Sequence, residues 1–288
     1  MFLSRKILEQ KLLIFLAEDV GQGDLTTSLI VRDRMLVEAE VIAKQEGIVA
    51  GIEEAVTLIE SLGLSAETLV KDGDAIKQKQ TLIKIKGDAR TLLSVERTLL
   101  NIISRMSGIA TATRRIVEAL EHAGLKTKVA STRKTAPGML YFDKKAVWIG
   151  GGDTHRAHLD DMVLIKDNHI ALAGSIEKAL KSARRNVSFT KKIEIEVTDS
   201  QGALVASRAG ADIIMLDNFA PKQIIRTIGI LKKEKLRNGV VIEASGGINC
   251  ENVLDFASTG VDVVSIGEIT HSARSINVSL EITKKCGN

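Results

Sequence analysis

The stretch AGADIIMLDN (209–218) decides the fold, because its pattern returns at TGVDVVSIGE (259–268). In each stretch a glycine follows a helical segment, one residue intervenes, and an aspartate precedes an apolar run. Glycine is favoured just beyond a helix because it adopts the left-handed conformation without a steric penalty. The apolar runs do not alternate with polar residues, which is typical of strands buried on both faces. The two stretches therefore predict successive strand–helix units of a parallel sheet.

Runs of the same character continue this pattern from Gly124 to the end of the second stretch. The predicted strands are KVAS (128–131), MVLIK (162–166), KIEIEV (192–197), DIIMLD (212–217), VVIEAS (240–245) and VDVVSIG (261–267). The helical stretches between them lie at about 171–185, 200–209, 221–236 and 249–258. We expect a barrel rather than an open sheet, because polar residues follow nearly every strand and no G-x-G-x-x-G follows any.

The first part of the chain has a different rhythm. An amphipathic helix is predicted at 5–17, and the alternation from Met35 to Gly51 predicts a half-buried strand. Residues 71–89 indicate strands around Asp-Gly turns. The longest helical stretch is 92–123, where Gly108 indicates either close packing or a break between two helices.

Composition limits the function classes. The chain has 288 residues, with 44% hydrophobic and 3% aromatic residues and a net charge of +4. This balance is mildly basic, and so few aromatic side chains argue against a nucleic-acid-binding protein. No apolar run approaches the roughly 20 residues of a membrane span, and the N-terminus has no signal-peptide pattern. Cys250 and Cys286 form no disulfide or metal-binding pattern, so we expect a soluble cytoplasmic protein.

Most cations of the segment Ser131–His169 fall into three short groups, TRKT, HR and IKDNH. Each group lies beside a turn signal or at the end of an apolar run, which is the arrangement of an anion site. Arginine side chains are planar forks that suit carboxylates, although a single arginine is explained equally well by a salt bridge. The residues of the predicted anion site are Arg133, Lys134, His155, Arg156 and Lys166. Together they indicate a substrate with several negative charges.

Acids and glycines follow the other strands. Glu196 and Asp217 are interpreted either as internal ion-pair partners or as oxygen ligands for Mg²⁺ shared with substrate phosphates. SGGI (245–248) and SIG (265–267) resemble a phosphate cup, in which glycines expose backbone N–H groups and a helix begins at about Asn249. A buried lysine at position 166 would also permit a Schiff-base aldolase.

A family resemblance rests on motifs in a fixed order. They are EDVGQGDLTT, ERTLLN, SGIAT, TRKTAPG, GGGDTHR, LIKDNH, EIEV, IMLDN, EASGGI and GVDVVSIGEITHS, within residues 18–272. This order resembles the quinolinate phosphoribosyltransferase family, also called nicotinate-nucleotide pyrophosphorylase (carboxylating). The resemblance implies an N-terminal α/β sandwich domain (1–112), joined by the C-terminal segment 271–288. It further implies an incomplete, TIM-like α/β barrel (113–270) as the catalytic domain.

The resemblance also implies a reaction and a set of site residues. Quinolinate and phosphoribosyl pyrophosphate would give nicotinate mononucleotide, CO₂ and pyrophosphate with Mg²⁺, in de novo NAD biosynthesis. A homodimer is implied, in which Arg97 reaches the partner's site. The residues expected to bind the quinolinate carboxylates are Arg133, His155, Arg156 and Lys166, with Thr132 beside them. The residues expected around the sugar phosphates, the ribose and the metal are Lys134, Lys166, Glu196 and Asp217, which form the catalytic set. The residues expected in the 5′-phosphate cup are Ser245, Gly246, Gly247, Ser265, Ile266 and Gly267.

The sequence departs from the family at one position. Leu140 stands where the family usually has an arginine after the Pro-Gly of TRKTAPG, and either Lys144 or Lys145 is expected to supply the cation. This departure keeps two alternatives of the same fold open. One is the molybdenum-transport-associated paralogue, and the other is a non-catalytic phosphate-binding barrel.

Overall fold

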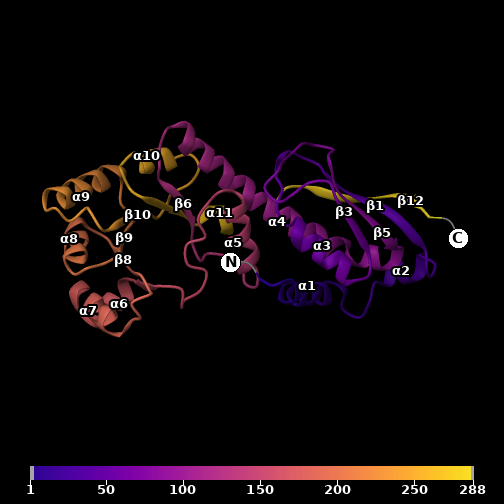
Figure 1. Ribbon diagram of the computed structural model, residues 1–288, viewed down its shortest axis with the longest axis horizontal. Helices are drawn as coiled ribbons and strands as arrows, with labels where there is room; N and C mark the ends of the chain where they lie inside the picture. The colour runs from indigo at the N-terminus through magenta and orange to yellow at the C-terminus, as the bar shows by residue number, and fades with distance from the viewer. Residues whose placement is uncertain (1–2, 287–288) are drawn as a thin grey trace. The chain divides into compact units, whose positions relative to one another are not determined.

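The computed structural model describes residues 3–286, which form two compact units (Figure 1). The first unit comprises the chain up to Ala112, the short segment Trp148–Gly150, and the C-terminal segment from Ala273. The second unit comprises the remaining residues, 113–147 and 151–272. Within residues 3–286, no helix combines the length and the apolar character that crossing a membrane requires.

The first unit is built on an antiparallel sheet with the strand order β12-β1-β5-β3. Its strands are β1 (Leu36–Ala43), β3 (Ser65–Thr68), β5 (Thr81–Asp88) and β12 (Val278–Lys285), and β2 (Gly47–Ile48) pairs with β4 (Ala75–Ile76). Its helices are α1 (Arg5–Val20), α2 (Leu25–Ile30), α3 (Ile52–Ser61) and the first part of α4 (Ala89–His122). Alternate residues of β1 are buried, which confirms the predicted half-buried strand.

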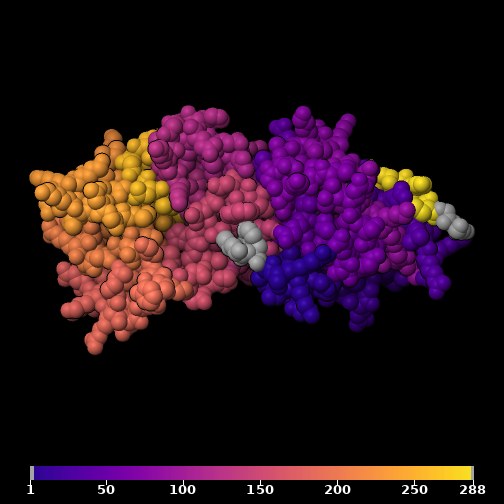
Figure 2. Space-filling model, in the orientation of Figure 1, coloured from indigo at the N-terminus to yellow at the C-terminus, as the bar shows by residue number. Residues whose placement is uncertain are grey.

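The C-terminal segment belongs to this first unit. Strand β12, yellow in Figures 1 and 2, pairs with β1 although almost the whole chain separates them in sequence. Helix α4 continues without interruption past Gly108. A Cβ atom at Gly108 would lie 2.2 Å from the carbonyl oxygen of Arg274. Of the two interpretations of Gly108, close packing is therefore right and a helix break is wrong.

The second unit contains six parallel strands in the order β6-β11-β10-β9-β8-β7, which confirms the predicted parallel α/β architecture. The strands are β6 (Lys128–Ser131), β7 (Val163–Ile165), β8 (Ile193–Val197), β9 (Ile213–Asp217), β10 (Val241–Ser245) and β11 (Val263–Ile266). The helices are the second part of α4, most of α5 (Leu140–Ile149), α6 (Asp167–Ala173), α7 (Ile176–Asn186), α8 (Ser200–Arg208), α9 (Pro221–Lys233), α10 (Val253–Ala257) and α11 (Glu268–His271). Strands β6 and β7 form the two edges of this hydrogen-bonded sheet.

The repeated Gly-x-Asp junction has one structural role in both copies. Gly210 and Gly260 have φ values of +82° and +90°, the left-handed conformation predicted for the end of a helix. The carboxylate of Asp212 accepts a hydrogen bond from the N–H of Ile193, the first residue of β8, at 2.7 Å. Asp262 accepts from the N–H of Ile242 near the start of β10, also at 2.7 Å. Each junction therefore fixes the beginning of a neighbouring strand.

Candidate active site

The predicted polar residues at the strand ends lie on one face of the parallel sheet. Glu196 and Glu243 occupy one row of the register, on either side of β9. Asp217 pairs with Ser245, and Ser245 pairs with Ser265, in a second row nearer the carboxyl ends. Residues in register on parallel strands point to the same side, and so do residues two apart on one strand. The strand ends therefore bring together the predicted acids and both predicted serines.

The glycine turn after β10 has no room for a side chain at Gly246. This residue has a φ of +97°, and a Cβ atom there would lie 2.3 Å from Oδ1 of Asn218. The N–H of Asn218 donates to the carbonyl oxygen of Ser245 at 2.8 Å, which holds the two loops together. Gly247 follows with a φ of +65°. Two successive left-handed residues bring the backbone itself to the surface of the site, as the cup prediction requires.

The helix after this turn begins later than predicted. Residues 249–252 form a turn, in which the side chain of Asn249 accepts from the N–H of Glu251 at 2.9 Å. Nδ2 of Asn252 donates to the carbonyl oxygen of Gly247 at 2.9 Å. Helix α10 starts only at Val253, so the expectation of a helix N-terminus at Asn249 is wrong. Asparagine side chains satisfy the backbone groups locally instead.

Lys134 lies at the turn after β11. A Cβ atom at Gly267 would be 3.2 Å from Cδ of Lys134, and Oγ1 of Thr270 donates to the carbonyl oxygen of Lys134 at 2.8 Å. Oγ1 of Thr132 accepts from the N–H of Lys134 at 3.1 Å and so shapes the same loop. The TRKT segment and the SIG turn, two separate predictions, are thus neighbours.

The two remaining members of that turn differ in what they offer a ligand. Oγ of Ser265 is buried and has no hydrogen-bond partner within residues 3–286. Ile266 is fully buried, whereas Gly267 is partly exposed. The turn therefore offers a ligand the backbone of Gly267, with the Ser265 hydroxyl enclosed beneath the surface.

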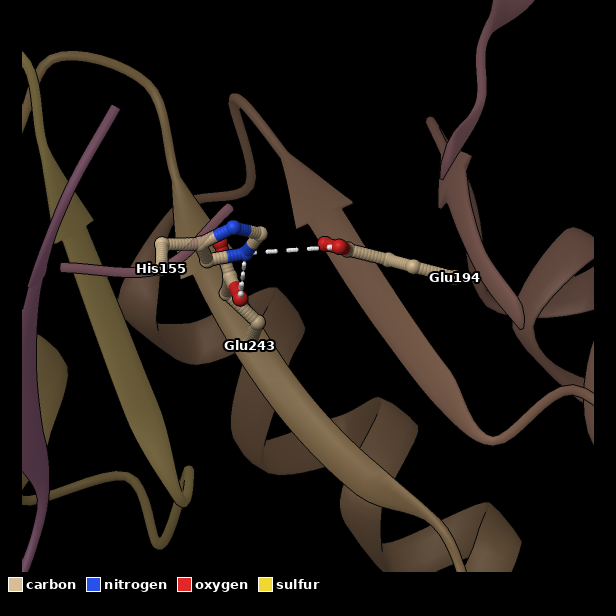
Figure 3. A group of neighbouring side chains, drawn as sticks. All are labelled: His155, Glu194 and Glu243. Carbon is tan, nitrogen blue, oxygen red and sulfur yellow. Dashed lines mark hydrogen bonds and ion pairs between the residues drawn. The ribbon is translucent and has the colours of Figure 1, made fainter. Parts of the chain in front are cut away.

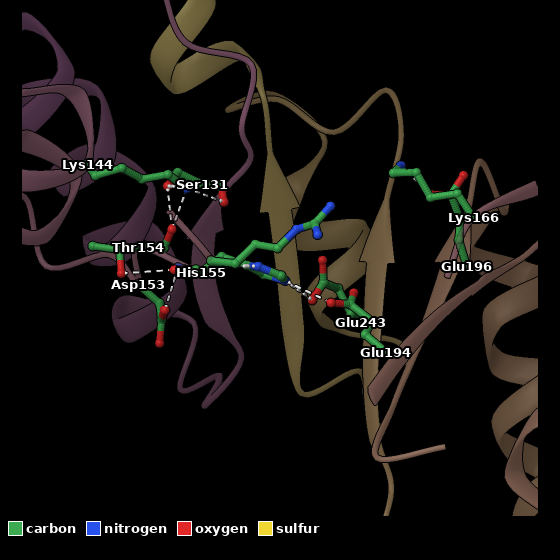
Figure 4. A network of polar contacts seen from close by, with 10 residues as sticks. Ser131, Lys144, Asp153, Thr154, His155, Lys166, Glu194, Glu196 and Glu243 are labelled. Atoms are coloured by element: carbon green, nitrogen blue, oxygen red, sulfur yellow. Dashed lines mark hydrogen bonds and ion pairs between the residues drawn. The ribbon is translucent and has the colours of Figure 1, made fainter. Parts of the chain in front are cut away.

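Lys166 and Glu196 form an ion pair. Nζ of Lys166 lies 2.6 Å from Oε2 of Glu196 (Figure 4). The lysine side chain is 45% exposed, which contradicts the buried lysine that the aldolase interpretation needs. Asp217 accepts from Nδ2 of Asn218 at 2.7 Å. Both predicted metal-binding acids thus have local partners, as the ion-pair alternative expects for Glu196.

A buried lysine ties together two loops of the predicted anion site. Nζ of Lys144 donates to Oγ of Ser131 at 3.0 Å and also hydrogen-bonds the carbonyl oxygen of Thr154 (Figure 4). Burial lowers the pKa of Lys144 to about 8, and the charges of Arg133 and Arg156 act in the same direction. Burial also lowers the pKa of Arg156, and Arg133 adds to that shift. Arg133, Lys144 and Arg156 therefore form one cluster of mutually repelling cations.

His155 contacts two buried carboxylates. Its Nε2 lies 3.2 Å from Oε2 of Glu243 and 3.3 Å from Oε2 of Glu194 (Figure 3). Glu194 and Glu243 are 0% and 1% exposed. The other nitrogen of the ring, Nδ1, accepts a hydrogen bond from the backbone N–H of Arg156 at 2.7 Å. Both ring nitrogens therefore already have protein partners.

This buried group retains one proton beyond the one on Nε2. Burial is the main cause of the raised pKa of Glu194, and the charge of Glu243 acts in the same direction. Burial lowers the pKa of His155, but its hydrogen bonds to Glu194 and Glu243 outweigh this effect and raise the pKa to about 10. The additional proton has two possible positions, Nδ1 or a carboxylate, and the net charge of the group is the same in both.

Three residues named from the sequence lie outside the groups described above. Arg97 is exposed on α4 in the first unit. Leu140 begins α5 and is partly exposed. Lys145 is buried, as is Lys144, and it is Lys144 that reaches the loops around Arg133 and Arg156.

Glu194 and Glu243 are site residues that the sequence prediction did not include. A signal was present for both. Glu194 precedes Glu196 by two residues, and Glu243 precedes Ser245 by two residues, so each shares its face with a predicted residue. An acid inside an otherwise apolar parallel strand is itself a departure from the pattern.

Two family models match consecutive parts of the chain. Residues 24–107 match the N-terminal domain of quinolinate phosphoribosyl transferase, and residues 109–281 match its C-terminal domain. Together the two matches span nearly all of the described residues.

Relatives and solved structures agree with these matches. A probable nicotinate-nucleotide pyrophosphorylase [carboxylating] from Methanothermobacter thermautotrophicus is 46% identical over 264 residues, covering 92% of this chain and 95% of the relative. The human nicotinate-nucleotide pyrophosphorylase [carboxylating] is 37% identical over 248 residues, covering 86% and 83%. The crystal structure of NadC from Streptococcus pyogenes superimposes with a TM-score of 0.91 at 35% identity, over 100% of both chains. The chain therefore belongs to the quinolinate phosphoribosyl transferase family.

Proposed function

We infer that this chain is a carboxylating nicotinate-nucleotide pyrophosphorylase, a pentosyltransferase of nicotinate nucleotide and NAD biosynthesis. It joins quinolinate to phosphoribosyl pyrophosphate and releases nicotinate mononucleotide, CO₂ and pyrophosphate. One observation carries this inference beyond family membership. The cation cluster of Arg133, Lys144 and Arg156 belongs to the same unit as two glycine turns that fit a phosphate.

The cation cluster suits the two carboxylates of quinolinate. The charges of Arg133 and Arg156 repel one another, and partial burial of Arg156 adds to the cost of its charge. A dicarboxylate would relieve that repulsion, and each planar guanidinium can donate two hydrogen bonds to one carboxylate. Lys166 would complete the binding of quinolinate after exchanging its partner Glu196 for the substrate.

The glycine turns suit the 5′-phosphate of the second substrate. The turn at Gly246 and Gly247 exposes backbone, and the turn at Gly267 has Lys134 beside it. Backbone N–H groups and a lysine are the usual donors to phosphate. We assign the sugar phosphate to these two turns, with Lys134 also available to the pyrophosphate.

The reaction needs positioning and charge stabilisation more than acid–base chemistry. The ring nitrogen of quinolinate attacks the anomeric carbon while the bond to pyrophosphate breaks, through a transition state with a cationic sugar. Glu196 and Asp217 would lie near the ribose and hold Mg²⁺, which when bound would offset the charge of the departing pyrophosphate. The carboxylate next to the ring nitrogen then leaves as CO₂. Its bonding electrons pass to the ring carbon beside the positive nitrogen, and a proton takes its place there.

The direct test supplies the purified protein with quinolinate, phosphoribosyl pyrophosphate and MgCl₂. We expect CO₂ and nicotinate mononucleotide in equal amounts, measured by trapping of labelled CO₂ and by chromatography. Product from nicotinate but not from quinolinate would contradict the assignment and indicate a salvage enzyme. Binding of both substrates without turnover would also contradict it, and would favour the non-catalytic barrel that the sequence left open.

We further propose that the active form is a homodimer in which Arg97 completes the partner's site. Arg97 is exposed, and it belongs to the ERTLLN motif on which the family resemblance rests. Mixing Arg97→Ala protein with Lys134→Ala protein would then create hybrid dimers with one intact site. Random exchange should restore about a quarter of the wild-type activity, because half the dimers are hybrids and half their sites are intact. Full activity in a monomer would refute this assembly.

The cytoplasm is the compartment that we propose for the reaction. Cys250 and Cys286 are both free thiols, which suits a reducing environment. Both proposed substrates are polar and charged, so the reaction needs no membrane site.

A further inference from the structure

Lys144 is a buried cation whose hydrogen bonds join two loops of the site. It lies on α5 and is 2% exposed, and with a pKa of about 8 it is mainly in the ammonium form at neutral pH. Its Nζ donates to Oγ of Ser131 at 3.0 Å, to the carbonyl oxygen of Ser131 at 3.3 Å and to the carbonyl oxygen of Thr154 (Figure 4). An ammonium group has three N–H donors and no acceptor. The three protein oxygens therefore match the three donors of Lys144.

Ser131 completes the connection between the two loops. Its buried Oγ accepts from Lys144 and donates to the carbonyl oxygen of Thr154 at 3.2 Å. The backbone N–H of Ser131 also donates to the carbonyl oxygen of Asp153 at 3.0 Å. The end of β6 and residues 153–154 are thus held side by side. Together, Lys144, Ser131 and the Thr154 carbonyl group form a hydrogen-bonded unit, the Lys144 bridge.

The bridge lies at the same distance along the chain from each arginine of the predicted anion site. Arg133 comes two residues after Ser131. Arg156 likewise comes two residues after Thr154. The charges of the two arginines repel one another, which adds to the effect of burial in lowering the pKa of Arg156. This repulsion would drive the guanidinium groups apart if the loops were free to move, and the bridge is a buried connection that opposes the movement.

The two carboxylates of quinolinate require a fixed separation of the groups that bind them. They are attached to neighbouring carbons of a rigid ring, so the distance between them cannot adapt to the site. Two planar guanidinium groups bind both carboxylates well only when their own separation matches this distance. A pair of carboxylates on ring carbons further apart has the same charge but a different separation. The requirement is therefore one of geometry and not of charge alone.

We propose that Lys144 is a positioning residue that sets the separation of Arg133 and Arg156. It does so through the Lys144 bridge, and the result is a site selective for two carboxylates on neighbouring carbons of one ring. Lys144 contributes hydrogen bonds within the protein rather than a contact with the substrate. The proposal rests on the proposed function for its ligand, quinolinate. It also changes the role expected of Lys144, from a substitute for the family's arginine cation to a connection between loops.

Two isomers of one dicarboxylate test this selectivity without turnover. Benzene-1,2-dicarboxylate has its carboxylates on neighbouring ring carbons, as quinolinate does, whereas benzene-1,3-dicarboxylate has the same charge and a wider spacing. We expect the wild-type protein to bind the 1,2 isomer about tenfold or more tightly than the 1,3 isomer, measured by isothermal titration calorimetry. Lys144→Met keeps an unbranched side chain but has no donor, and should reduce this ratio to less than about threefold.

The ratio of the two affinities separates positioning from charge. If Lys144 acted only through its charge, Lys144→Met would weaken the binding of both isomers by the same factor. The ratio would then be unchanged, which would overturn the proposal. A wild-type protein that binds both isomers equally, or neither of them, would overturn it as well.

Ser131→Ala keeps the ammonium group and its charge, and removes one acceptor of the bridge. The ratio should fall about threefold, which also tests the proposal if Lys144→Met does not fold. This effect should be absent in the Lys144→Met background, because both residues act through the same bridge. Unfolding in urea identifies any variant that is not folded. An unchanged ratio in folded Ser131→Ala protein would contradict the role of the bridge. Lys181→Met and Ser182→Ala, both exposed on α7, are the matched controls and should leave the ratio unchanged.

Steady-state kinetics tests the same residue with the substrate itself. At saturating phosphoribosyl pyrophosphate, Lys144→Met should raise the KM for quinolinate about tenfold to a hundredfold, while kcat stays within about threefold. The reason is that the bridge holds the groups that bind the carboxylates. A fall in kcat with an unchanged KM would show that Lys144 does not position the two arginines.

The binding and kinetic measurements distinguish this proposal from the proposed function. If the isomer ratio is lost in Lys144→Met but the wild-type protein forms no nicotinate mononucleotide, the proposed function is refuted and the positioning role stands. If the wild-type protein converts quinolinate but the isomer ratio is the same in Lys144→Met, the positioning role alone is refuted.

Discussion

Acidic side chains that precede the parallel strands and those inside the strands differ in their hydrogen-bond partners. At the amino ends of the strands, Asp212 accepts from Arg184 at 2.9 Å and from a backbone N–H, and Asp262 receives two hydrogen bonds from Arg237 at 2.8 and 2.9 Å. Further along the strands, at the second residue of β8 and the third residue of β10, Oε1 of Glu194 and Oε1 of Glu243 are buried without a hydrogen-bond partner within residues 3–286.

The paired aspartates therefore stabilise the fold, whereas the two buried glutamates do so less well. Buried polar atoms without partners cost free energy, so a protein keeps them where another requirement outweighs stability. Arg133, two residues after β6, and the glycine turns that follow β10 and β11 lie at the carboxyl ends of the strands, where parallel α/β units build their active sites. We therefore expect substitutions at the two ends to separate activity from stability.

The largest effect is expected for Lys134→Ala. This side chain is exposed and lies beside the Gly267 turn, so its loss should lower kcat/KM by about a hundredfold to a thousandfold. The free energy of unfolding should change by less than about 0.5 kcal/mol. Steady-state kinetics and urea denaturation measure the two quantities. Lys128→Ala, an exposed lysine at the amino end of β6, is the control and should leave kcat/KM unchanged.

A somewhat smaller effect is expected for Gly246→Ala. The added Cβ would meet Asn218 at 2.3 Å, so the turn must open, and the KM for phosphoribosyl pyrophosphate should rise about tenfold or more. Strain at this φ should also cost about 1–3 kcal/mol of stability. Gly239→Ala is the matched control, because Gly239 has a similar φ of +94° and nothing within 4 Å of the added Cβ. If both variants raise the KM equally, the phosphate cup is not at Gly246.

Asp212→Ala should have the reverse profile. It removes the acceptor of the Ile193 N–H and of Arg184, and should cost about 1–3 kcal/mol in the free energy of unfolding. Because Asp212 lies at the opposite end of the strand from the site, kcat/KM should stay within about twofold. Arg184→Ala removes only the exposed partner and should cost less. A loss of activity without a loss of stability would contradict this prediction for the amino ends of the strands.

The smallest effect is a pH dependence of stability. The folded pKa of His155, about 10, lies above its ordinary 6.5, so its stabilising contribution is complete below pH 6.5 and declines as pH rises towards 10. The folded pKa of Lys144, about 8, lies below its ordinary 10.5, so stability recovers with pH between these values. The two trends oppose each other above pH 8. Between pH 6.5 and 8 we expect a loss of about 1 kcal/mol, absent in His155→Gln, measured by denaturation at several pH values.

The fold could be predicted from the sequence because its signals are local. The glycine after each helix and the apolar run after each aspartate are readable without any tertiary contact, and both junctions formed as expected. The start of α10 was misplaced for an equally local reason. The side chains of Asn249 and Asn252 complete a turn, which delays the helix to Val253.

The candidate site could be predicted only in part. The residue types that follow the strands indicated which groups meet, and Lys134 does lie beside Gly267. The direction of the His155 ring could not be predicted, because it depends on a left-handed backbone residue and on carboxylates 39 and 88 positions away in sequence. Burial of Glu194 and Glu243 is likewise a property of the closed structure rather than of the strands that contain them.

The aspartate of each Gly-x-Asp junction also fixes the register of the neighbouring strand. Strand β9 has five residues, Ile213–Asp217, and Asp212 fixes the level at which it and β8 begin. Because side chains alternate along a strand, this starting level determines which of them face inward at the carboxyl end. A slip of one residue would turn all of them to the opposite face. An insertion or deletion within β9 should therefore be far more harmful than any single substitution there. The positions of the side chains at the carboxyl ends therefore depend on hydrogen bonds made at the amino ends of the strands.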